Sequence, residues 1–338
     1  MERRESTLRY NPTLRRNTNM TTPSTTTTAA ALFAAFCVGP IAGCDVAPEA
    51  AVADGAGEID FRYCPTCIGN APKVNGSRVR ELSLAGAPNI DGVKVLAAKD
   101  LYYGSLTLGV DTVTSSLKAS NQNYQLVGQD LEGVDIELST LAGIVKVTIV
   151  DVDTLPTWSD LGHDEYIYRM SYYDSNNAPQ HLCDSSDPDG DWLTVLPHEI
   201  VVPGKTHVIT EDTDWFTLAC VGEAAFKMKM LGYSRYSPSA PTKDERVATI
   251  RMVTADYCGT GTSFTTAGVP VAWSDRSGTV SPPFAEVSME AQWDEGGAVC
   301  LNTPRQFPIE SIEDECGAIP KCTTNWVTDT TWRTMLPW

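Results

Sequence analysis

Positive charge is scarce in this 338-residue sequence, which has 25 lysine and arginine residues against 43 aspartate and glutamate residues. Five of the arginines and two of the glutamates lie in the first 44 residues, which leaves 20 basic and 41 acidic residues in the rest. Such an acidic chain is a poor partner for nucleic acid and for an anionic membrane surface. The acidity fits either cation binding or a solvated acidic exterior, and we favour the second.

Histidine and catalytic motifs are also scarce. The sequence has neither the Gly-x-Ser-x-Gly motif of serine hydrolases nor the His-Glu-x-x-His motif of zinc proteases. Its few histidines lie within residues 163–207, where they either form a metal site or lie scattered on the surface. We favour scattered histidines and expect no cofactor. They are His163, His181, His198 and His207.

The apolar run of residues 29–38 is too short to cross a bilayer, which takes about 20 helical residues. It follows an arginine-rich opening and precedes small residues, a layout that predicts a secretory signal peptide over residues 1–43. If the chain starts at Met20 instead of Met1, the leader has no basic side chain, but the end of the leader is unchanged. The segment ends in Ile-Ala-Gly-Cys, which resembles a bacterial lipobox. That resemblance implies cleavage before Cys44 and a lipid anchor on it.

The expected location is therefore the cell envelope, with the outer membrane or the cell surface favoured over the inner membrane. An ordinary cleaved signal peptide that contains a cysteine by chance is the alternative. After the anchor, residues 44–60 are rich in small and acidic residues and predict a flexible tether.

Cysteine is the exception to these scarcities, with ten residues. Cys37 lies in the predicted leader and Cys44 in the lipobox, which leaves an even number for an exported chain and predicts disulfide bonds. Eight cysteines allow 105 connectivities, so the sequence does not fix the pairs. We predict pairing between nearest neighbours: Cys64–Cys67, Cys183–Cys220, Cys258–Cys300 and Cys316–Cys322.

Residues 61–160 predict a β-rich region, because short alternating segments such as 134–138 and 144–152 are separated by glycine, asparagine and aspartate turns. Alternation continues at 165–173, and two helix-prone segments follow at 222–231 and 244–257. The predicted fold is β-rich, mainly an antiparallel sandwich or barrel, with a smaller α+β C-terminal part and stabilising disulfides. The remaining predicted divisions are a domain over 161–305 and a disulfide-looped tail over 306–338.

Residues 254–259, Thr-Ala-Asp-Tyr-Cys-Gly, resemble the signature of the ADYC-domain proteins, a largely myxobacterial family whose members often carry lipoprotein or secretory leaders. Similarity extends over roughly residues 165–305. The resemblance implies a compartment and domain limits, but it transfers no activity. The signature residues are Ala255, Asp256, Tyr257, Cys258 and Gly259.

This sequence departs from the family pattern at two positions that usually hold cysteine, where it has Met228 and Thr249. The resemblance therefore implies that one disulfide is absent as a unit. It also implies that the two predicted helices face each other, with these two side chains filling the space between them.

Several residues invite a chemical interpretation. Asp256, Tyr257 and Cys258 form either a catalytic cluster or a disulfide beside a capped glycine-rich turn, and we expect the disulfide. Asp187, Asp189 and Asp191 resemble part of a calcium loop, although the first carboxylate and the closing glutamate of such a loop are missing. We favour the alternative, an acidic surface turn. The tryptophans fit either a glycan-binding face or a β-rich core.

The leading hypothesis is a non-enzymatic envelope lipoprotein that acts as a binding or structural module for an envelope protein or a glycan. An extracellular hydrolase or carbohydrate-active enzyme is the second hypothesis, and it requires a cleft with two converging carboxylates, one with a raised pKa. A calcium-dependent adhesion module is the third.

Overall fold

Alternation of apolar and polar residues produces the strands that dominate the fold. In β8 (Asp135–Thr140), Ile136 and Leu138 are buried while the residues between them are more exposed. The same alternation marks β9 (Gly143–Pro156), where Val145, Val147 and Ile149 face the interior. The computed structural model describes residues 71–183, 190–202, 208–266, 268–282 and 288–337.

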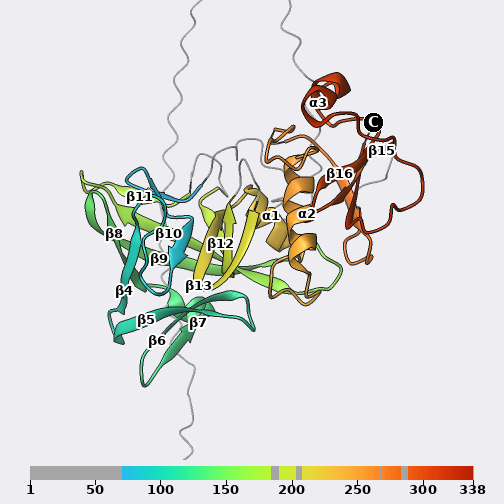
Figure 1. Cartoon of the computed structure of the whole chain (residues 1–338). Coiled ribbons are helices and arrows are strands. Elements are labelled where there is room, and N and C mark those ends of the chain that lie inside the picture. The colour runs from blue at the N-terminus through green and yellow to red at the C-terminus, as the bar shows by residue number, and fades with distance from the viewer. Residues whose placement is uncertain (1–70, 184–189, 203–207, 267, 283–287, 338) are drawn as a thin grey trace, which may run out of the picture. The chain divides into compact units, whose positions relative to one another are not determined.

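Antiparallel pairing joins most of these strands into one large sheet, in the order β3-β13-β12-β10-β9-β8-β4-β5-β6-β7, with β11 paired to β10 (Figure 1). This is the antiparallel, β-rich fold that the sequence predicts. A separate hairpin of β1 (Lys73–Val74) and β2 (Ser77–Arg78) turns through Asn75 and Gly76. The other strands of the sheet are β3 (Glu81–Ser83), β4 (Lys94–Asp100), β5 (Gly104–Asp111), β6 (Ser116–Ser120), β7 (Gln125–Val127), β10 (Asp164–Tyr173), β11 (Pro179–His181), β12 (Trp192–Val202) and β13 (Val208–Cys220).

The two faces of the central strands bury different cores. On one face, Tyr168 of β10 packs with apolar residues of β5, β6, β8 and β9, and its hydroxyl accepts a hydrogen bond from the Leu117 amide at 3.1 Å. The short helix η1 (Gly128–Leu131) completes this side. On the opposite face, Ile167 and Trp192 pack with the helices and the C-terminal strands. The chain therefore builds two hydrophobic cores on one sheet.

The C-terminal part combines helices with a second antiparallel sheet. Helix α2 (Lys243–Thr254) starts at a capping box, in which Thr242 and Glu245 bind each other's backbone amides. Helix α1 (Ala224–Met230) packs against α2. The small sheet has the order β14-β17-β15-β16. Its strands are β14 (Ala272–Asp275), β15 (Ser288–Asp294), β16 (Gly297–Leu301) and β17 (Trp332–Leu336), and α3 (Ile309–Cys316) precedes β17.

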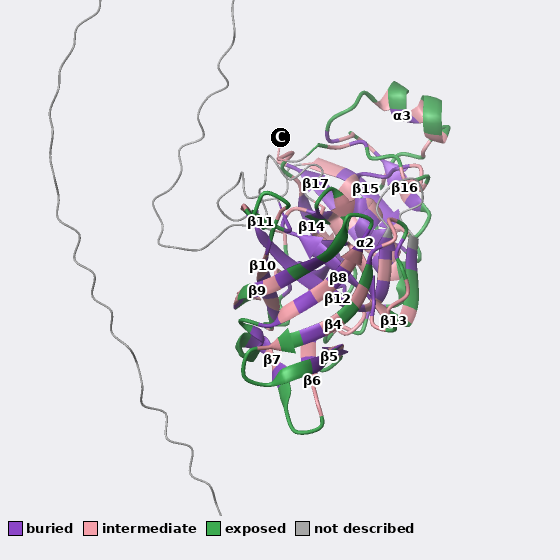
Figure 2. Cartoon of the chain, turned by 90° about the vertical axis from the view of Figure 1, so that its left-hand side faces the viewer, coloured by how far each residue is buried: buried purple, intermediate pink, exposed green. Residues whose placement is uncertain are grey.

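Figure 2 shows the burial of these elements, with buried residues gathered along the strands and α2, and α3 mostly exposed. Within the described ranges, no helix is long and apolar enough to cross a membrane. The two predicted helix segments correspond to α1 and α2, although α2 ends at Thr254, three residues before the predicted end.

Three disulfides connect described cysteines, and two of them differ from the predicted pairs. Cys183 pairs with Cys220 as predicted. The predicted Cys258–Cys300 and Cys316–Cys322 pairs are wrong, because Cys258 pairs with Cys316 and Cys300 with Cys322. Cys64 and Cys67 lie outside the described residues.

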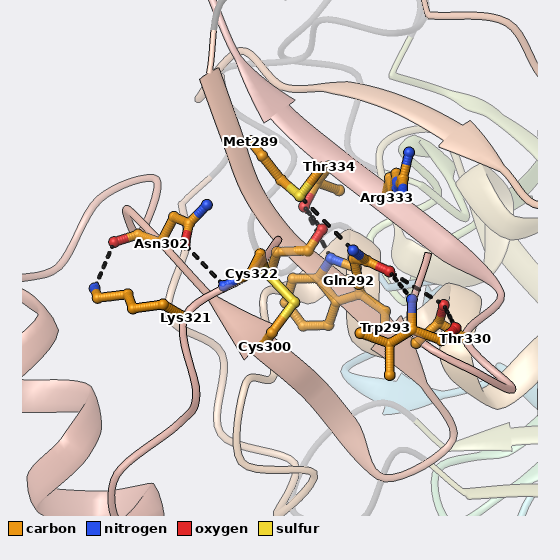
Figure 3. The surroundings of a disulfide bond; sticks show 12 residues. Met289, Gln292, Trp293, Cys300, Asn302, Lys321, Cys322, Thr330, Arg333 and Thr334 are labelled. Carbon is orange, nitrogen blue, oxygen red and sulfur yellow. Dashed lines mark hydrogen bonds between the residues drawn. A yellow bond between two sulfur atoms is a disulfide. The ribbon is translucent and has the colours of Figure 1, made fainter. Parts of the chain in front are cut away.

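The folding of the C-terminal chain explains why these cysteines pair differently from the prediction. Helix α3 carries Cys316 back to the end of α2, where Cys258 lies. The next segment then runs beside β16, as the 2.8 Å hydrogen bond from the Leu301 amide to the Pro320 carbonyl shows. This brings Cys322 to Cys300, and the Cys322 amide binds the Asn302 side chain at 2.9 Å (Figure 3).

Candidate functional site

The signature Ala255–Gly259 begins where α2 stops. Ala255 takes the left-handed conformation, with φ of 52°, and its amide binds the Arg251 and Met252 carbonyls. Asp256 follows and is fully buried. Its carboxylate accepts hydrogen bonds from the amides of Thr260 and Gly261 at 3.1 and 2.9 Å, so it fixes the glycine-rich turn.

Gly259 is required by the close approach of the β15–β16 turn. Its φ is +68°, and a Cβ atom there would overlap the carbonyl oxygen of Gly296. On the other side of the contact, the amide of Ala298 donates to the Tyr257 carbonyl at 2.9 Å. The signature therefore docks the end of α2 onto the start of β16.

Tyr257 and Glu290 form a buried polar network with Arg305. The Tyr257 hydroxyl donates to Glu290 Oε1 at 2.5 Å, and Arg305 holds both carboxylate oxygens, through Nε at 2.7 Å and Nη2 at 2.9 Å. Arg305 also donates to the Met252 carbonyl at the end of α2. Burial, together with the charge of Glu290, raises the pKa of Tyr257 well above its usual value. The tyrosine is thus a neutral hydrogen-bond donor inside the protein.

Cys258 completes the signature through its disulfide to Cys316. A disulfide sulfur has no thiolate with which to attack a substrate. Asp256 and Tyr257 are also bound to interior partners, so these signature residues join α2 to the elements around it.

A second cluster joins α2 to the large sheet. Glu199 of β12 and Glu211 of β13 lie directly opposite each other in the strand register, and both bind the guanidinium of Arg246. Glu199 is fully buried and contacts Arg246 Nε at 2.6 Å. Burial raises the pKa of Glu199 to about 7, while the charge of Arg246 opposes this.

The second carboxylate of this cluster titrates in the opposite direction. Partial burial raises the pKa of Glu211, but the hydrogen bond from Arg246 and the charge of Arg235 outweigh burial and hold it below its usual value. The two converging carboxylates with unequal pKa values are the feature that the hydrolase hypothesis requires. However, Glu199 is closed off from solvent, and both acids contact the guanidinium of Arg246.

His198 stands beside this cluster at an irregularity in the β12–β13 pairing. It has a φ of 57°, a conformation that side chains with a Cβ seldom adopt. Its Nδ1 lies 2.6 Å from the Tyr236 hydroxyl, and its carbonyl accepts a hydrogen bond from Arg235 at 2.9 Å. Partial burial and the nearby charge of Arg235 lower the pKa of His198, so the ring is mostly neutral at pH 7.

A third group of charges surrounds Lys229 of α1, which is fully buried. Its Nζ donates to the carbonyls of Ser115 and Val195, each at 2.6 Å, and lies 3.0 Å from Glu165. The other oxygen of Glu165 faces His163 at 3.3 Å. Desolvation lowers the pKa of Lys229, and Glu165 opposes the shift.

The comparison with protein families decides the relationship of this chain. The family model of the ADYC domain matches residues 128–307. This range includes the whole signature and the charged side chains around Glu290, Glu199 and Lys229. The chain belongs to the ADYC-domain family. A search of the curated proteins finds no match, and neither does a search of the solved structures.

Within this ADYC-domain protein, only some of the residues considered as metal ligands are described. Asp187, Asp189 and His207 fall outside the described residues, as does Cys44. Asp191 binds Arg169 at 2.7 Å. His163, His181 and His198 face Glu165, Asp191 and Tyr236, respectively. In the part of the chain that the structure describes, no three histidine, cysteine, aspartate or glutamate residues are grouped as metal ligands would be.

The described tryptophans lie mainly in the interior of the protein. Trp293 and Trp332 are fully buried, and their indole N–H groups donate to Thr334 and Thr249, each at 2.8 Å. Figure 3 shows Trp293 beside the Cys300–Cys322 disulfide. Trp192 and Trp273 are also buried, Trp215 and Trp326 are half-buried, and Trp338 lies outside the described residues.

Met228 and Thr249 are both fully buried where α1 packs on α2, in agreement with the family-based expectation that these helices face each other. Thr249 does more than fill space, because its hydroxyl accepts the indole N–H of Trp332. The charged residues around Glu199 and Lys229 were not expected as clusters. Their only sequence signal is that Glu165, Glu199 and Lys229 interrupt otherwise apolar segments.

Proposed function

We propose that this ADYC-domain protein is exported, held at an envelope membrane by a lipid on Cys44, and acts there as a non-catalytic binding module. The observation that carries the proposal is the use of the signature: Asp256, Tyr257 and Cys258 all bind interior partners. Signature residues that stabilise the fold favour a domain that supports a binding surface elsewhere on the protein. The disulfides between described cysteines favour an oxidising compartment outside the cytoplasm.

The ligand surface that we propose is the aromatic turn, defined as Leu101, Tyr102, Tyr103 and Tyr124. Leu101 and Tyr102 are 87% and 86% exposed at the β4–β5 connection. The ring of Tyr103 contacts that of Tyr124 at 4.8 Å between centroids. Solvent-exposed apolar and aromatic side chains gathered on one turn are typical of protein interaction sites.

Hydrogen bonds within the turn hold it in place before any partner arrives. One oxygen of Asp100 accepts the amides of Tyr102 and Tyr103 at 2.7 and 2.9 Å. The Asn121 side chain donates to the Tyr103 carbonyl and accepts the Tyr124 amide. Because these polar groups already have partners, the turn offers apolar contact more than hydrogen bonding. It therefore suits an apolar protein surface better than a glycan.

A hydrolase is the second candidate, favoured only by Glu199 with its pKa of about 7 beside the half-buried His198. We place it second because Arg246 binds both carboxylates and Glu199 is fully buried. A Glu199→Gln protein that loses a hydrolytic activity while keeping its fold would reverse this order.

The anchor is tested by metabolic labelling with palmitate. The parent protein should incorporate the label and fractionate with membranes, and the Cys44→Ala variant should do neither. Cys37→Ala is the matched control and should still be labelled, because Cys37 precedes the predicted cleavage site. Label retained by Cys44→Ala would exclude the anchor.

The aromatic turn is tested by site-specific photocrosslinking in intact cells. A crosslinker at position 102 should give a discrete protein adduct that Leu101→Ser abolishes. Val113 is a suitable control, because it is 89% exposed at the turn between β5 and β6. A crosslinker there should not give the same adduct. Equal adducts at both positions would contradict the proposed binding surface.

A further inference from the structure

A second group of exposed apolar side chains lies at the other end of β4. We name Ile90, Leu141, Ile144 and Tyr173 the N-terminal face. Ile90 and Leu141 are 84% and 88% exposed, and Ile144 and Tyr173 are exposed as well. Monomeric proteins seldom leave several large apolar side chains together in water without a partner for them.

The strand register brings these residues to one end of the sheet. Leu141 lies in the tight turn between β8 and β9, and Ile144 follows it, opposite Ser139. Gly92, in the turn that carries Ile90, lies beside Leu141, since a Cβ built there would be 3.7 Å from Leu141 Cδ2. On the next strand, Tyr172 is in register with Val147, so Tyr173 lies at the end of β10 that is nearest to Ile144.

The described chain begins at this same end. The Lys73 amide donates to the Leu182 carbonyl at 2.8 Å, and the Asn75 amide binds the Tyr172 hydroxyl at 3.1 Å. The start of the described chain is thus tied to Leu182, which follows β11, and to the Tyr172 side chain of β10. Figure 1 shows the blue start of the described chain close to β11, which pairs with this end of β10.

Charge at the N-terminal face is mixed, because Asp91 follows Ile90 and Asp174 follows Tyr173. The sequence carries a net charge of −18, but exposed lysines lie at this end. Lys94 is in register with Ser139, one position across the sheet from Ile144. Lys146 is two residues along β9, where it pairs with Asp135 at 3.2 Å. Lys73 lies at the chain start. Exposed apolar side chains, a tyrosine and lysines are the composition of protein surfaces that lie in a lipid headgroup region.

We propose that the N-terminal face rests on the bilayer to which the protein is anchored. This inference rests on the proposed lipid anchor at Cys44. A chain reaches at most about 3.5 Å per residue, so the residues between Cys44 and Lys73 can span the distance to a bilayer in contact with the face. The apolar side chains would enter the headgroup region, and the lysines would meet lipid phosphates.

The consequence is a fixed orientation of the domain. β4 runs from Lys94, beside the N-terminal face, to Asp100, at the aromatic turn. A seven-residue strand is about 20 Å long, so the aromatic turn would be held away from the bilayer and open to partners.

The test is fluorescence quenching by brominated phospholipids, which quench a tryptophan only when it enters the bilayer. Leu141→Trp and Ile144→Trp report on the N-terminal face, and Leu101→Trp is the control, because Leu101 is equally exposed at the opposite end of β4. The lipidated proteins are placed in vesicles of phosphatidylethanolamine and phosphatidylglycerol. The emission of the tryptophan introduced at position 141 or 144 should fall at least about twofold when the vesicles contain brominated lipid. The emission of the tryptophan introduced at position 101 should not change.

Equal quenching at all three positions, or none at 141 and 144, would overturn the proposal. An absence of quenching at positions 141 and 144 is also the result expected if the natural partner of this face is a protein and not lipid. Mass spectrometry of the same samples reports separately on the anchor, since an unacylated Cys44 refutes the anchor alone. In that case the quenching test is repeated without acylation. The chain from residue 45 onward is attached to nickel-chelating lipid by an N-terminal hexahistidine tag.

Discussion

The hydroxyl of Tyr257 donates a 2.5 Å hydrogen bond to Glu290, and this contact joins the end of α2 to β15. Glu290 is fully buried and is also held by Arg305. Tyr257, which the family signature marks, therefore closes a network whose other members lie 33 and 48 residues away along the chain.

Replacing Tyr257 with phenylalanine tests that network. Since a hydrogen bond to a charged group contributes about 1.5–3 kcal/mol, we expect Tyr257→Phe to lower the free energy of unfolding by this amount in urea titrations. Tyr124→Phe is the control, because Tyr124 is 53% exposed and its change should be close to zero. Similar losses in both variants would contradict the role given to Tyr257.

Gly259 and Gly76 provide a matched pair for the close approach at the signature. Both have positive φ, but a Cβ at Gly76 meets nothing within 4 Å, whereas one at Gly259 overlaps the Gly296 carbonyl. Gly76→Ala should cost about 1–2 kcal/mol from backbone strain alone. Gly259→Ala should cost clearly more, because backbone must also move, and thermal melts of the two variants provide the comparison.

The disulfide pairs are open to direct measurement. Proteolysis without reduction, followed by mass spectrometry, should yield peptides that link Cys258 to Cys316 and Cys300 to Cys322. In the chain-entropy account, removing the Cys258–Cys316 bond, which spans 58 residues, should cost about 4 kcal/mol. The Cys258→Ala/Cys316→Ala protein should therefore unfold at lower urea. Recovery of a Cys258–Cys300 peptide would contradict the structure.

Stability should vary with pH through Glu199. Burial raises its pKa to about 7 in the folded protein, and its unfolded pKa is about 4.3. Between these values the folded state keeps a proton that the unfolded state has released, so this contribution is complete below pH about 4.3 and is lost as the pH rises to about 7. Glu199→Gln, which stays neutral, should gain stability over the parent protein across that window, on the order of 3 kcal/mol.

Glu211→Gln is the internal control for the pH measurement. The pKa of Glu211 is held below its usual value, despite partial burial, by the hydrogen bond from Arg246 and the charge of Arg235. Its contribution is therefore present above its unfolded pKa and is lost as the pH falls through the folded value. The two variants should differ from the parent with opposite pH trends in urea titrations. Parallel trends would show that Glu199 is not protonated inside the fold.

The sequence predicts the β-rich class and the positions of individual elements well, because alternation and helix periodicity are local. The segment 144–152 becomes part of β9, and 165–173 becomes most of β10. Segments that require distant partners are harder. Residues 79–84 alternate like one strand, yet the observed strand β3 contains only Glu81–Ser83. Its length is set by pairing with β13, which lies more than 100 residues later in the sequence.

The candidate site is predictable only in part, for the same reason. The signature could be recognised from its residues, and a capping function for an aspartate before two glycines follows from local chemistry. The cluster of Glu199, Glu211 and Arg246 depends on a cross-strand register and on the docking of α2, and neither is written in the spacing of those residues. Nearest-neighbour pairing was right for Cys183 and Cys220. It failed for the later cysteines because α3 brings Cys316 back to Cys258.

The position of β17 has a consequence for the order in which the protein is assembled. This strand lies between β14 and β15 in the small sheet, although it follows both of them along the chain. During synthesis from the N-terminus, β14 lacks its partner strand until residue 336 has been made, and Trp332 and Trp293 cannot pack against each other before then. The small sheet is therefore the last part to close, and an interrupted translation product would expose apolar edges that quality-control proteases recognise.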